Sequence, residues 1–168
     1  MNQDIENAFL EAIEQDRHKL LRICSVYAKD EDDKKDLFQE ALINIWQSMS
    51  GFNGHASLST WMYRITLNVC LRLQSKNAKM TDKFRNLDSI SIENIRTDEK
   101  DNGEHAKLVQ LRNCIKKLND ADKAVITLYL EELPYKDISE ITGLSENNVA
   151  VKIKRVKEKL LNCIRGKS

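Results

Sequence analysis

A single proline and five glycines in 168 residues are the strongest constraint on the fold of this chain. Hairpin turns depend on these residue types, and a β sandwich or barrel needs many such turns. Apolar residues recur instead at helical spacing, and 41% of the residues are hydrophobic, enough to form a packed core. We therefore predict an all-α fold, and a chain of this length has room for two small helical domains.

Residues 1–80 contain three apolar runs at helical spacing, which predict a compact N-terminal helical bundle. Charged residues 29–33 separate the first two runs, residues 50–51 end the second, and Ser57 is a suitable N-cap for the third. The apolar positions are Phe9, Ala12, Ile13, Leu20, Cys24 and Tyr27, then Leu37, Ala41, Leu42, Ile45 and Met49, then Leu58, Trp61, Met62, Ile65 and Val69.

The composition changes over residues 81–106, where acidic residues become frequent and the helical periodicity fades. We interpret this segment as a flexible acidic linker between two domains. An irregular helix packed on a neighbouring element is the alternative, because four large aliphatic residues are unusual in a linker. These are Leu87, Ile90, Ile92 and Ile95.

Residues 107–168 regain helical order and form the second predicted domain. We expect one helix over residues 107–118 and another that starts near Asn119 or Asp120, both of which are good caps.

The end of this domain has the helix-start and turn residues that are typical of a helix-turn-helix. Pro134 opens a short helix over residues 135–141, Gly143 supplies a turn, and Ser145 caps a final helix. The stripe expected to be buried on the final helix is Val149, Ile153, Val156 and Leu160.

The final helix and tail are strongly basic, although the net charge of the whole chain is only +1. The second helix of a helix-turn-helix lies in the major groove, where its first residues reach base edges and its cations meet phosphates. A hydrated basic face on an ordinary helical hairpin is the alternative. We expect base contacts from Asn147, Asn148 and Val151, and phosphate contacts from Lys152, Lys154 and Arg155.

The third run is also basic and suggests a second nucleic-acid surface. Cations beside aromatic rings suit a single strand, whose bases stack on such rings. The candidate rings are Phe52, Trp61 and Tyr63, although Trp61 lies on the apolar stripe, a position that favours the core over a surface role. Asn68 is polar beside an apolar stripe, so it needs a partner, which is either backbone or an extruded base. The charges are Arg64, Arg72, Lys76, Lys79, Lys83 and Arg85 against Asp82.

The second run carries an acidic stripe that DNA should avoid. Asp36, Gln39 and Glu40, with Asn44 or Gln47, suit a protein partner rich in arginine, because carboxylates accept paired guanidinium bonds. Taken alone, such a stripe is also compatible with an ordinary hydrated helix face.

Neither a metal site nor a membrane span is expected from the sequence. The four cysteines lie far apart without a zinc-ligand spacing, so we expect free, mostly buried thiols. They are Cys24, Cys70, Cys114 and Cys163. No apolar run is long enough to cross a bilayer, and the first residues lack the pattern of a signal peptide, which predicts a cytoplasmic protein that does not insert into membranes.

Three local patterns, taken in order, resemble the extracytoplasmic-function (ECF) group of the sigma-70 family of bacterial RNA polymerase sigma factors. The first is Asp-Leu-Phe-Gln-Glu over residues 36–40, followed by Trp46. The second is Ser-Thr-Trp-Met-Tyr-Arg-Ile over residues 59–65, followed by Asn68. The third is the helix-turn-helix over residues 133–145.

This resemblance implies a transcription initiation factor that needs no cofactor and is not an enzyme. Similar proteins dock on the clamp helices of the largest subunit of core RNA polymerase, open promoter DNA and capture a flipped base of the non-template strand. They often act under an anti-sigma factor. The polymerase-binding residues implied here are Asp36, Gln39, Glu40 and Asn44.

The same resemblance assigns two promoter contacts. For the minus-ten element, the implied residues are Phe52, Asn53, Gly54, Ser57, Trp61, Arg64, Asn68 and Arg72. For the minus-thirty-five element, they are Glu146, Asn147, Asn148, Val151, Lys152, Lys154 and Arg155.

Two other hypotheses stay open from the sequence. The alternative function is a stand-alone helix-turn-helix regulator whose N-terminal bundle senses a ligand or forms a dimer. An enzyme is less compatible, because the three histidines lack evident catalytic partners and no glycine-rich phosphate loop occurs.

Overall fold

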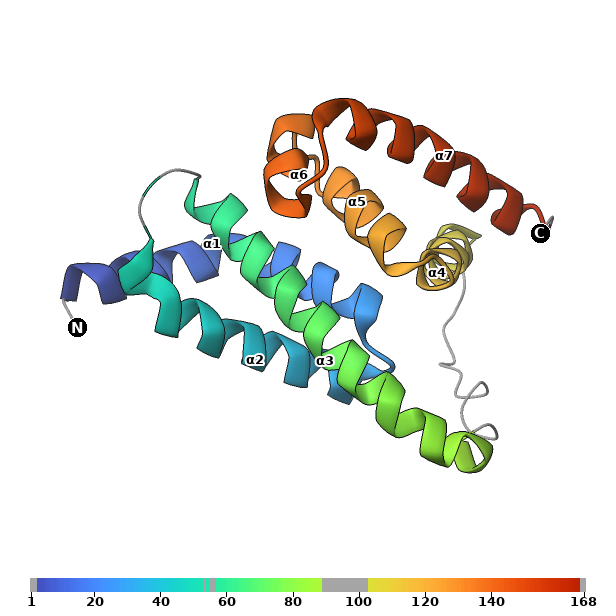
Figure 1. Ribbon diagram of the computed structural model, residues 1–168, viewed down its shortest axis with the longest axis horizontal. Helices are drawn as coiled ribbons and strands as arrows, with labels where there is room; N and C mark the ends of the chain where they lie inside the picture. Colours follow the sequence, from blue (N-terminus) through green and yellow to red (C-terminus); the bar gives the residue numbers. More distant parts are fainter. Residues whose placement is uncertain (1–2, 53, 55–56, 89–102, 167–168) are drawn as a thin grey trace.

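The computed structural model describes residues 3–52, 54, 57–88 and 103–166. Within these ranges no strand occurs, and the predicted all-α class is confirmed (Figure 1). The elements are α1 (Gln3–Tyr27), α2 (Glu31–Ser48), the short 3-10 helix η1 (Met49–Gly51), α3 (Leu58–Asp88), α4 (Gly103–Lys116), α5 (Asp120–Leu130), α6 (Tyr135–Thr142) and α7 (Glu146–Ile164).

In the N-terminal module (α1 to α3), side-chain caps fix the starts of α2 and α3. Asp30 caps α2, because its Oδ1 accepts the backbone N–H of Asp33 at 2.8 Å. The predicted cap of α3 is confirmed, since Ser57 Oγ accepts the backbone N–H of Thr60 at 3.1 Å. Each cap satisfies a backbone donor that the first helical turn leaves unpaired.

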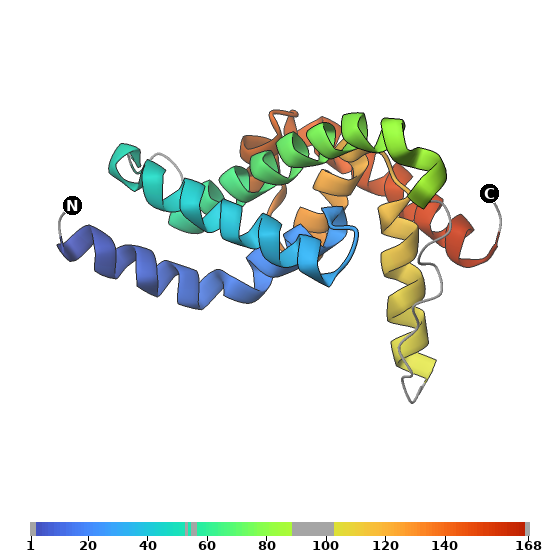
Figure 2. The ribbon, with the colours of Figure 1, turned by 90° about the horizontal axis from the view of Figure 1, so that it is seen from below.

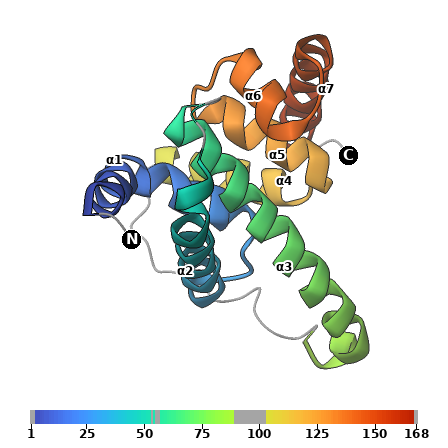
Figure 3. The ribbon, with the colours of Figure 1, turned by 60° about the vertical axis from the view of Figure 1, so that its left-hand side comes forward.

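The three helices of this module pack on one another, and the far end of α3 projects beyond α1 and α2 (Figure 3). Most of the predicted apolar positions are buried here. Five members of the predicted stripes are only half-buried, namely Trp61, Phe9, Leu42, Leu58 and Ile65.

The C-terminal module (α4 to α7) is organised around α7, which contacts α4, α5 and α6. The predicted stripe of α7 is confirmed, because its four residues are at most 7% exposed: Val149, Ile153, Val156 and Leu160. The start of α4 points away from the rest of the molecule (Figure 2).

Helical structure enters the segment predicted as a linker at both ends. Helix α3 continues to Asp88 and α4 begins at Gly103, whereas the prediction placed the linker at residues 81–106. Residues 89–102 lie outside the described part of the chain, and for them the linker stays a prediction.

The two modules pack directly against each other instead of standing apart. Arg22 of α1 makes a paired salt bridge with Glu131 at the end of α5, with both N–O distances 2.6 Å. Lys116 Nζ of α4 donates to the carbonyl oxygen of Ala28 at 3.1 Å, and α6 packs against α3. The buried apolar residues therefore form one cluster that runs through both modules.

The prediction of four free thiols is wrong for one pair. Cys114 of α4 and Cys163 of α7 form a disulfide with a Cα–Cα distance of 6.0 Å. The two cysteines are 49 residues apart in sequence, and only the packing of α4 on α7 brings them together. Cys24 and Cys70 are free and buried, as predicted.

Candidate functional site

Helices α6 and α7 and the turn between them form a helix-turn-helix with its expected local chemistry. Gly143 ends α6 with φ of 83°, in the left-handed region that a residue without Cβ adopts most easily. Ser145 then caps α7, because its Oγ accepts the backbone N–H of Asn148 at 3.1 Å. Ser139 of α6 ties the turn back by donating to the carbonyl oxygen of Leu144 at 2.5 Å. These bonds set the angle at which α7 leaves the turn.

The outer face of α7 presents most of the residues predicted to read duplex DNA. Val151 is 47% exposed, which is high for an apolar side chain on a helix whose other face is buried. The other exposed candidates are Glu146, Asn147, Asn148, Lys154 and Arg155.

Lys152 does not point freely into solvent as its neighbours do. Its Nζ donates to Oδ1 of Asp122 at 3.0 Å, and Lys159 Nζ donates to Oδ2 of the same carboxylate at 2.8 Å. Burial would by itself raise the pKa of Asp122, but the bonds from Lys159 and Lys152 outweigh it and lower that pKa. Lys152 therefore joins α7 to the start of α5, and the sequence-based expectation of a phosphate contact omitted this partner.

Asp122 is a functional residue that the sequence pattern does not predict. It lies in the first turn of α5 beside Asp120, where an acid is expected for the helix dipole alone. Asn119 caps this helix, with its Oδ1 accepting the backbone N–H of Asp122 at 2.8 Å. No signal in the sequence distinguishes Asp122 from Asp120, since only packing buries the former, to 2% exposed.

A hollow of about 310 Å³ lies between the start of α5 and the exposed face of α7. Its charged side chains are three cations and one carboxylate, and two of the predicted base-reading residues, Asn148 and Val151, are part of its lining. Its lining is Asn119, Asp122, Leu144, Asn148, Val151, Lys152, Arg155 and Lys159.

In the N-terminal module, Phe52 and Trp61 form an aromatic pair at the start of α3. Their ring centroids are 5.1 Å apart at a tilt of 55°, and both side chains are half-buried. Trp61 thus contributes to the core and to the surface at once. Gly54 is exposed with φ of 81°, whereas Asn53 lies outside the described residues.

The basic face of α3 is exposed at Arg64, Asn68 and Arg72. Arg64 Nη2 donates to the backbone carbonyl of Glu140 in α6, so the C-terminal module covers part of this face. Asn68 is exposed to solvent, so its side chain is accessible to an extruded base, which is one of the two partners expected for it.

Tyr63 does not belong to the candidate single-strand surface. Its side chain is buried, and its hydroxyl donates to Oδ1 of Asp16 at 3.3 Å. Ser59 donates to the other oxygen of that carboxylate at 2.5 Å. Burial and the nearby Asp16 carboxylate raise the pKa of Tyr63, so it stays neutral.

Helix α2 separates its apolar and polar faces as predicted. Leu37, Ala41 and Ile45 are buried, whereas Asp36 and Gln39 are exposed.

Two further residues of the predicted docking stripe on α2 are half-buried, namely Glu40 and Asn44. Asn44 Nδ2 donates to the backbone carbonyl of Glu40 at 2.8 Å. The structure thus brings Asp36, Gln39, Glu40 and Asn44 to one helix whose other face is fixed in the core.

No group of acidic, histidine and cysteine side chains able to hold a metal ion occurs among the described residues. In the same part of the chain, no helix is both long enough and apolar enough to cross a membrane.

Both modules match known protein families. Residues 12–80 match Sigma-70 region 2, and residues 108–160 match Sigma-70 region 4. The RNA polymerase sigma factor SigV of Bacillus subtilis is 27% identical over 135 residues, covering 80% of this chain and 77% of the relative. The ECF RNA polymerase sigma factor SigW of Bacillus subtilis is 25% identical over 171 residues, covering 95% of this chain and 90% of the relative.

Two solved structures share the fold. The sigma factor RpoE, in complex with the anti-sigma factor NepR from Bartonella quintana, aligns with a TM-score of 0.69 at 18% identity and covers 98% of each chain. CnrH, in complex with the cytosolic domain of CnrY, aligns with a TM-score of 0.71 at 19% identity, covering 97% of this chain and 91% of CnrH.

Proposed function

This chain belongs to the ECF group of the sigma-70 family of RNA polymerase sigma factors, and from that premise we propose how its surfaces divide the work of transcription initiation. A sigma factor is a regulatory DNA-binding protein that binds core RNA polymerase and directs it to promoters, while the polymerase makes the RNA. The protein should therefore work in the cytoplasm, where the polymerase is.

The exposed face of α7 reads the minus-thirty-five element as duplex DNA. This assignment is the one that the observations support most directly, because a capped basic helix follows a tight turn and keeps its recognition residues open to solvent. Asn147, Asn148 and Val151 contact base edges, whereas Lys154 and Arg155 contact phosphates and set the register. Glu146 lies at the same end of α7. Lys152 joins this contact only if DNA competes with Asp122 for its ammonium group.

The start of α3 and the loop before it recognise the minus-ten element. Phe52 and Trp61 offer half-buried rings on which an unpaired base can stack, and Arg64, Asn68 and Arg72 continue along one exposed face. The loop residues Asn53, Gly54 and Ser57 complete the proposed pocket for the flipped base.

The polar face of α2 docks on the clamp helices of the largest polymerase subunit. Asp36 and Gln39 are open to solvent, and Glu40 and Asn44 border them. Carboxylates here would accept paired hydrogen bonds from arginine side chains of the partner. The buried opposite face keeps these groups in a fixed row.

An anti-sigma factor is the second protein partner that we propose. The fold match with RpoE comes from a complex with an anti-sigma factor, and the chain aligns with that sigma factor over both modules. A partner of this kind would hold the modules in a packed arrangement and keep them from the polymerase.

Charge reversal of α2 tests the docking assignment. Asp36→Lys combined with Glu40→Lys should reduce co-purification with core polymerase at least about tenfold, because cations replace both proposed arginine acceptors. Run-off transcription with core enzyme should fall in parallel.

A matched control reverses two exposed acids on α1, Glu11→Lys and Glu14→Lys, and should leave both readouts unchanged. Full co-purification of the α2 variant would refute the docking face. Failure of the unaltered chain to initiate transcription with a competent core enzyme would refute the function itself.

A further inference from the structure

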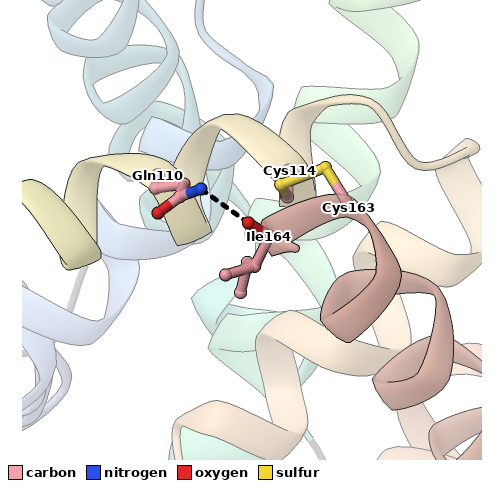
Figure 4. The surroundings of a disulfide bond; sticks show 4 residues. All are labelled: Gln110, Cys114, Cys163 and Ile164. Carbon is pink, nitrogen blue, oxygen red and sulfur yellow. Dashed lines mark hydrogen bonds between the residues drawn. A yellow bond between two sulfur atoms is a disulfide. The ribbon is translucent and has the colours of Figure 1, made fainter. Parts of the chain in front are cut away.

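The disulfide between Cys114 and Cys163 joins the helix that enters the C-terminal module to the end of the DNA-reading helix. Figure 4 shows the two sulfurs between α4 and the last turn of α7. One turn earlier on α4, Gln110 Nε2 donates to the carbonyl oxygen of Ile164 at 2.8 Å. One covalent bond and one exposed hydrogen bond therefore hold the same two segments together.

Small molecules can reach this disulfide. Both cysteines line an open cavity of about 410 Å³, and Cys163 is only half-buried. Lys117 and Lys159 line the same cavity, and nearby cations favour the thiolate form that takes part in disulfide exchange. An incoming thiolate would meet Cys163 first, because Cys114 is 5% exposed.

The other two cysteines provide an internal contrast. Cys70 of α3 donates a hydrogen bond from its Sγ to Sγ of Cys24 in α1 at 4.0 Å, yet both thiols are fully buried and form no disulfide. The two pairs also differ in access from solvent, because Cys163 is half-buried whereas Cys24 and Cys70 are fully buried.

The role of the disulfide depends on the redox conditions of the compartment in which the protein works, and this step rests on the proposed function. A factor that serves RNA polymerase works where small thiols keep most cysteines reduced. Disulfides found there are mostly transient and redox-sensing, not permanent staples.

We propose that Cys114 and Cys163 form a thiol–disulfide exchange site that low-molecular-weight thiols open and low-molecular-weight disulfides close. In opening, a thiolate attacks Cys163 Sγ, the Cys163–Cys114 bond breaks, and Cys114 leaves as a thiolate. A second thiolate then attacks the outer sulfur of the mixed disulfide, which releases Cys163. Two small thiols become one small disulfide, and the two protons they lose protonate the two protein thiolates. Closing is the reverse reaction.

Opening this site weakens the attachment of α4 to α7. The first half of α4 is poorly covered, with Leu108 60% and Val109 40% exposed, so few contacts replace the lost bond. The thiol pool thereby controls how firmly the DNA-reading helix is anchored.

Equilibration of the full chain in buffers of reduced and oxidised glutathione tests the exchange. Free thiols are then alkylated under native conditions and located by peptide mass spectrometry. The oxidised fraction should fall from about ten-elevenths to about one-eleventh as [GSH]²/[GSSG] rises about 100-fold, and it should recover when the ratio is reversed. Cys24 and Cys70 should stay unlabelled until the protein is denatured.

Hydrogen exchange on the same samples tests the anchoring. Reduction should speed exchange at least about tenfold over α4 and the last turn of α7, with no change in α5 and α6. Cys163→Ser should show the fast exchange in both buffers, and Cys70→Ala should still respond like the unaltered chain.

Three results would overturn the proposal: a pair that ignores the glutathione ratio unless denatured, equal native labelling of all four cysteines, or identical exchange of α4 in both states. Each is measured without transcription, so a failure here is distinct from a failure of the proposed function. The unaltered chain alone decides the outcome if a variant does not fold.

Discussion

Asp122 shows how one buried carboxylate organises the C-terminal module. Its side chain is 4% exposed and accepts from two lysines that lie two turns apart on α7. A buried carboxylate without partners would be costly, so both lysines are needed to keep the charged form in place. The residue thereby fixes the rotation of α7 relative to the start of α5.

Replacing this carboxylate should destabilise the protein in a pH-dependent way. Asp122→Asn is expected to lower the free energy of unfolding by about 1–3 kcal/mol at pH 7. The loss should be smaller than for a fully buried ion pair, because Lys152 and Lys159 are partly solvated. Urea unfolding at several pH values measures this difference. Asp120→Asn, an acid in the same helical turn, is the control and should change stability little.

The sign of the pH effect follows from the lowered pKa of Asp122. The folded state keeps this carboxylate ionised to lower pH than the unfolded chain does. Its stabilisation is therefore complete above the unfolded pKa of about 3.9 and is lost as the pH falls through the lower folded pKa. A difference between the two variants that persists unchanged at pH 2 would contradict this account.

At the scale of single elements, the caps and turns of the helix-turn-helix were predictable from the sequence. Gly143 and Ser145 have the roles that their residue types indicate. A left-handed backbone and an N-cap hydrogen bond each depend only on residues within one or two helical turns. Helix lengths were less predictable: α4 starts four residues before the expected position, at Gly103. The first turns of α4 have weak apolar periodicity in the sequence, and they extend from later turns that pack on α7.

The cap of α7 gives a test at this scale. Ser145→Ala should destabilise the protein by about 1 kcal/mol, because the N–H of Asn148 loses its acceptor. Chemical denaturation measures the loss, and weaker binding of minus-thirty-five duplex should accompany it. Ser48→Ala is the matched control, since Ser48 precedes η1 without a side-chain cap bond. Equal effects of the two substitutions would rule out the cap as the cause.

For the whole molecule, the arrangement of the modules is the main finding that the sequence did not anticipate. The salt bridge of Arg22 with Glu131 and the bond from Arg64 to Glu140 both cross between modules. The bond from Arg64 to α6 competes with the contact to promoter DNA that we propose for this residue. The packed molecule therefore has part of its proposed minus-ten surface covered, and we expect binding to polymerase to separate α6 from α3, which gives an open form of the molecule.

Removing the salt bridge between Arg22 and Glu131 should favour an open form in which the two modules separate. Arg22→Ala is expected to shift the equilibrium by about 1 kcal/mol, roughly fivefold, because Glu131 is buried while Arg22 is half-exposed. Small-angle X-ray scattering should show a larger radius of gyration.

The open form should also bind a promoter fragment more tightly at about 150 mM salt, where counterion release still contributes to affinity. Arg17→Ala is the control, since Arg17 lies over the ring of Phe38 in its own module. Tight promoter binding by the unaltered chain alone would show that the packed form covers nothing that DNA needs.

The sequence by itself determined the helices, the helix-turn-helix and the three charged faces, because these depend on residues at most a few turns apart. Periodicity, caps and clustered charges are local properties, and they also carry the family resemblance. Only the tertiary structure decided that Cys114 meets Cys163, that Asp122 binds two lysines of α7, and that Arg22 reaches Glu131. These pairs lie between 30 and 109 residues apart, and no local rule selects one distant partner among many similar side chains.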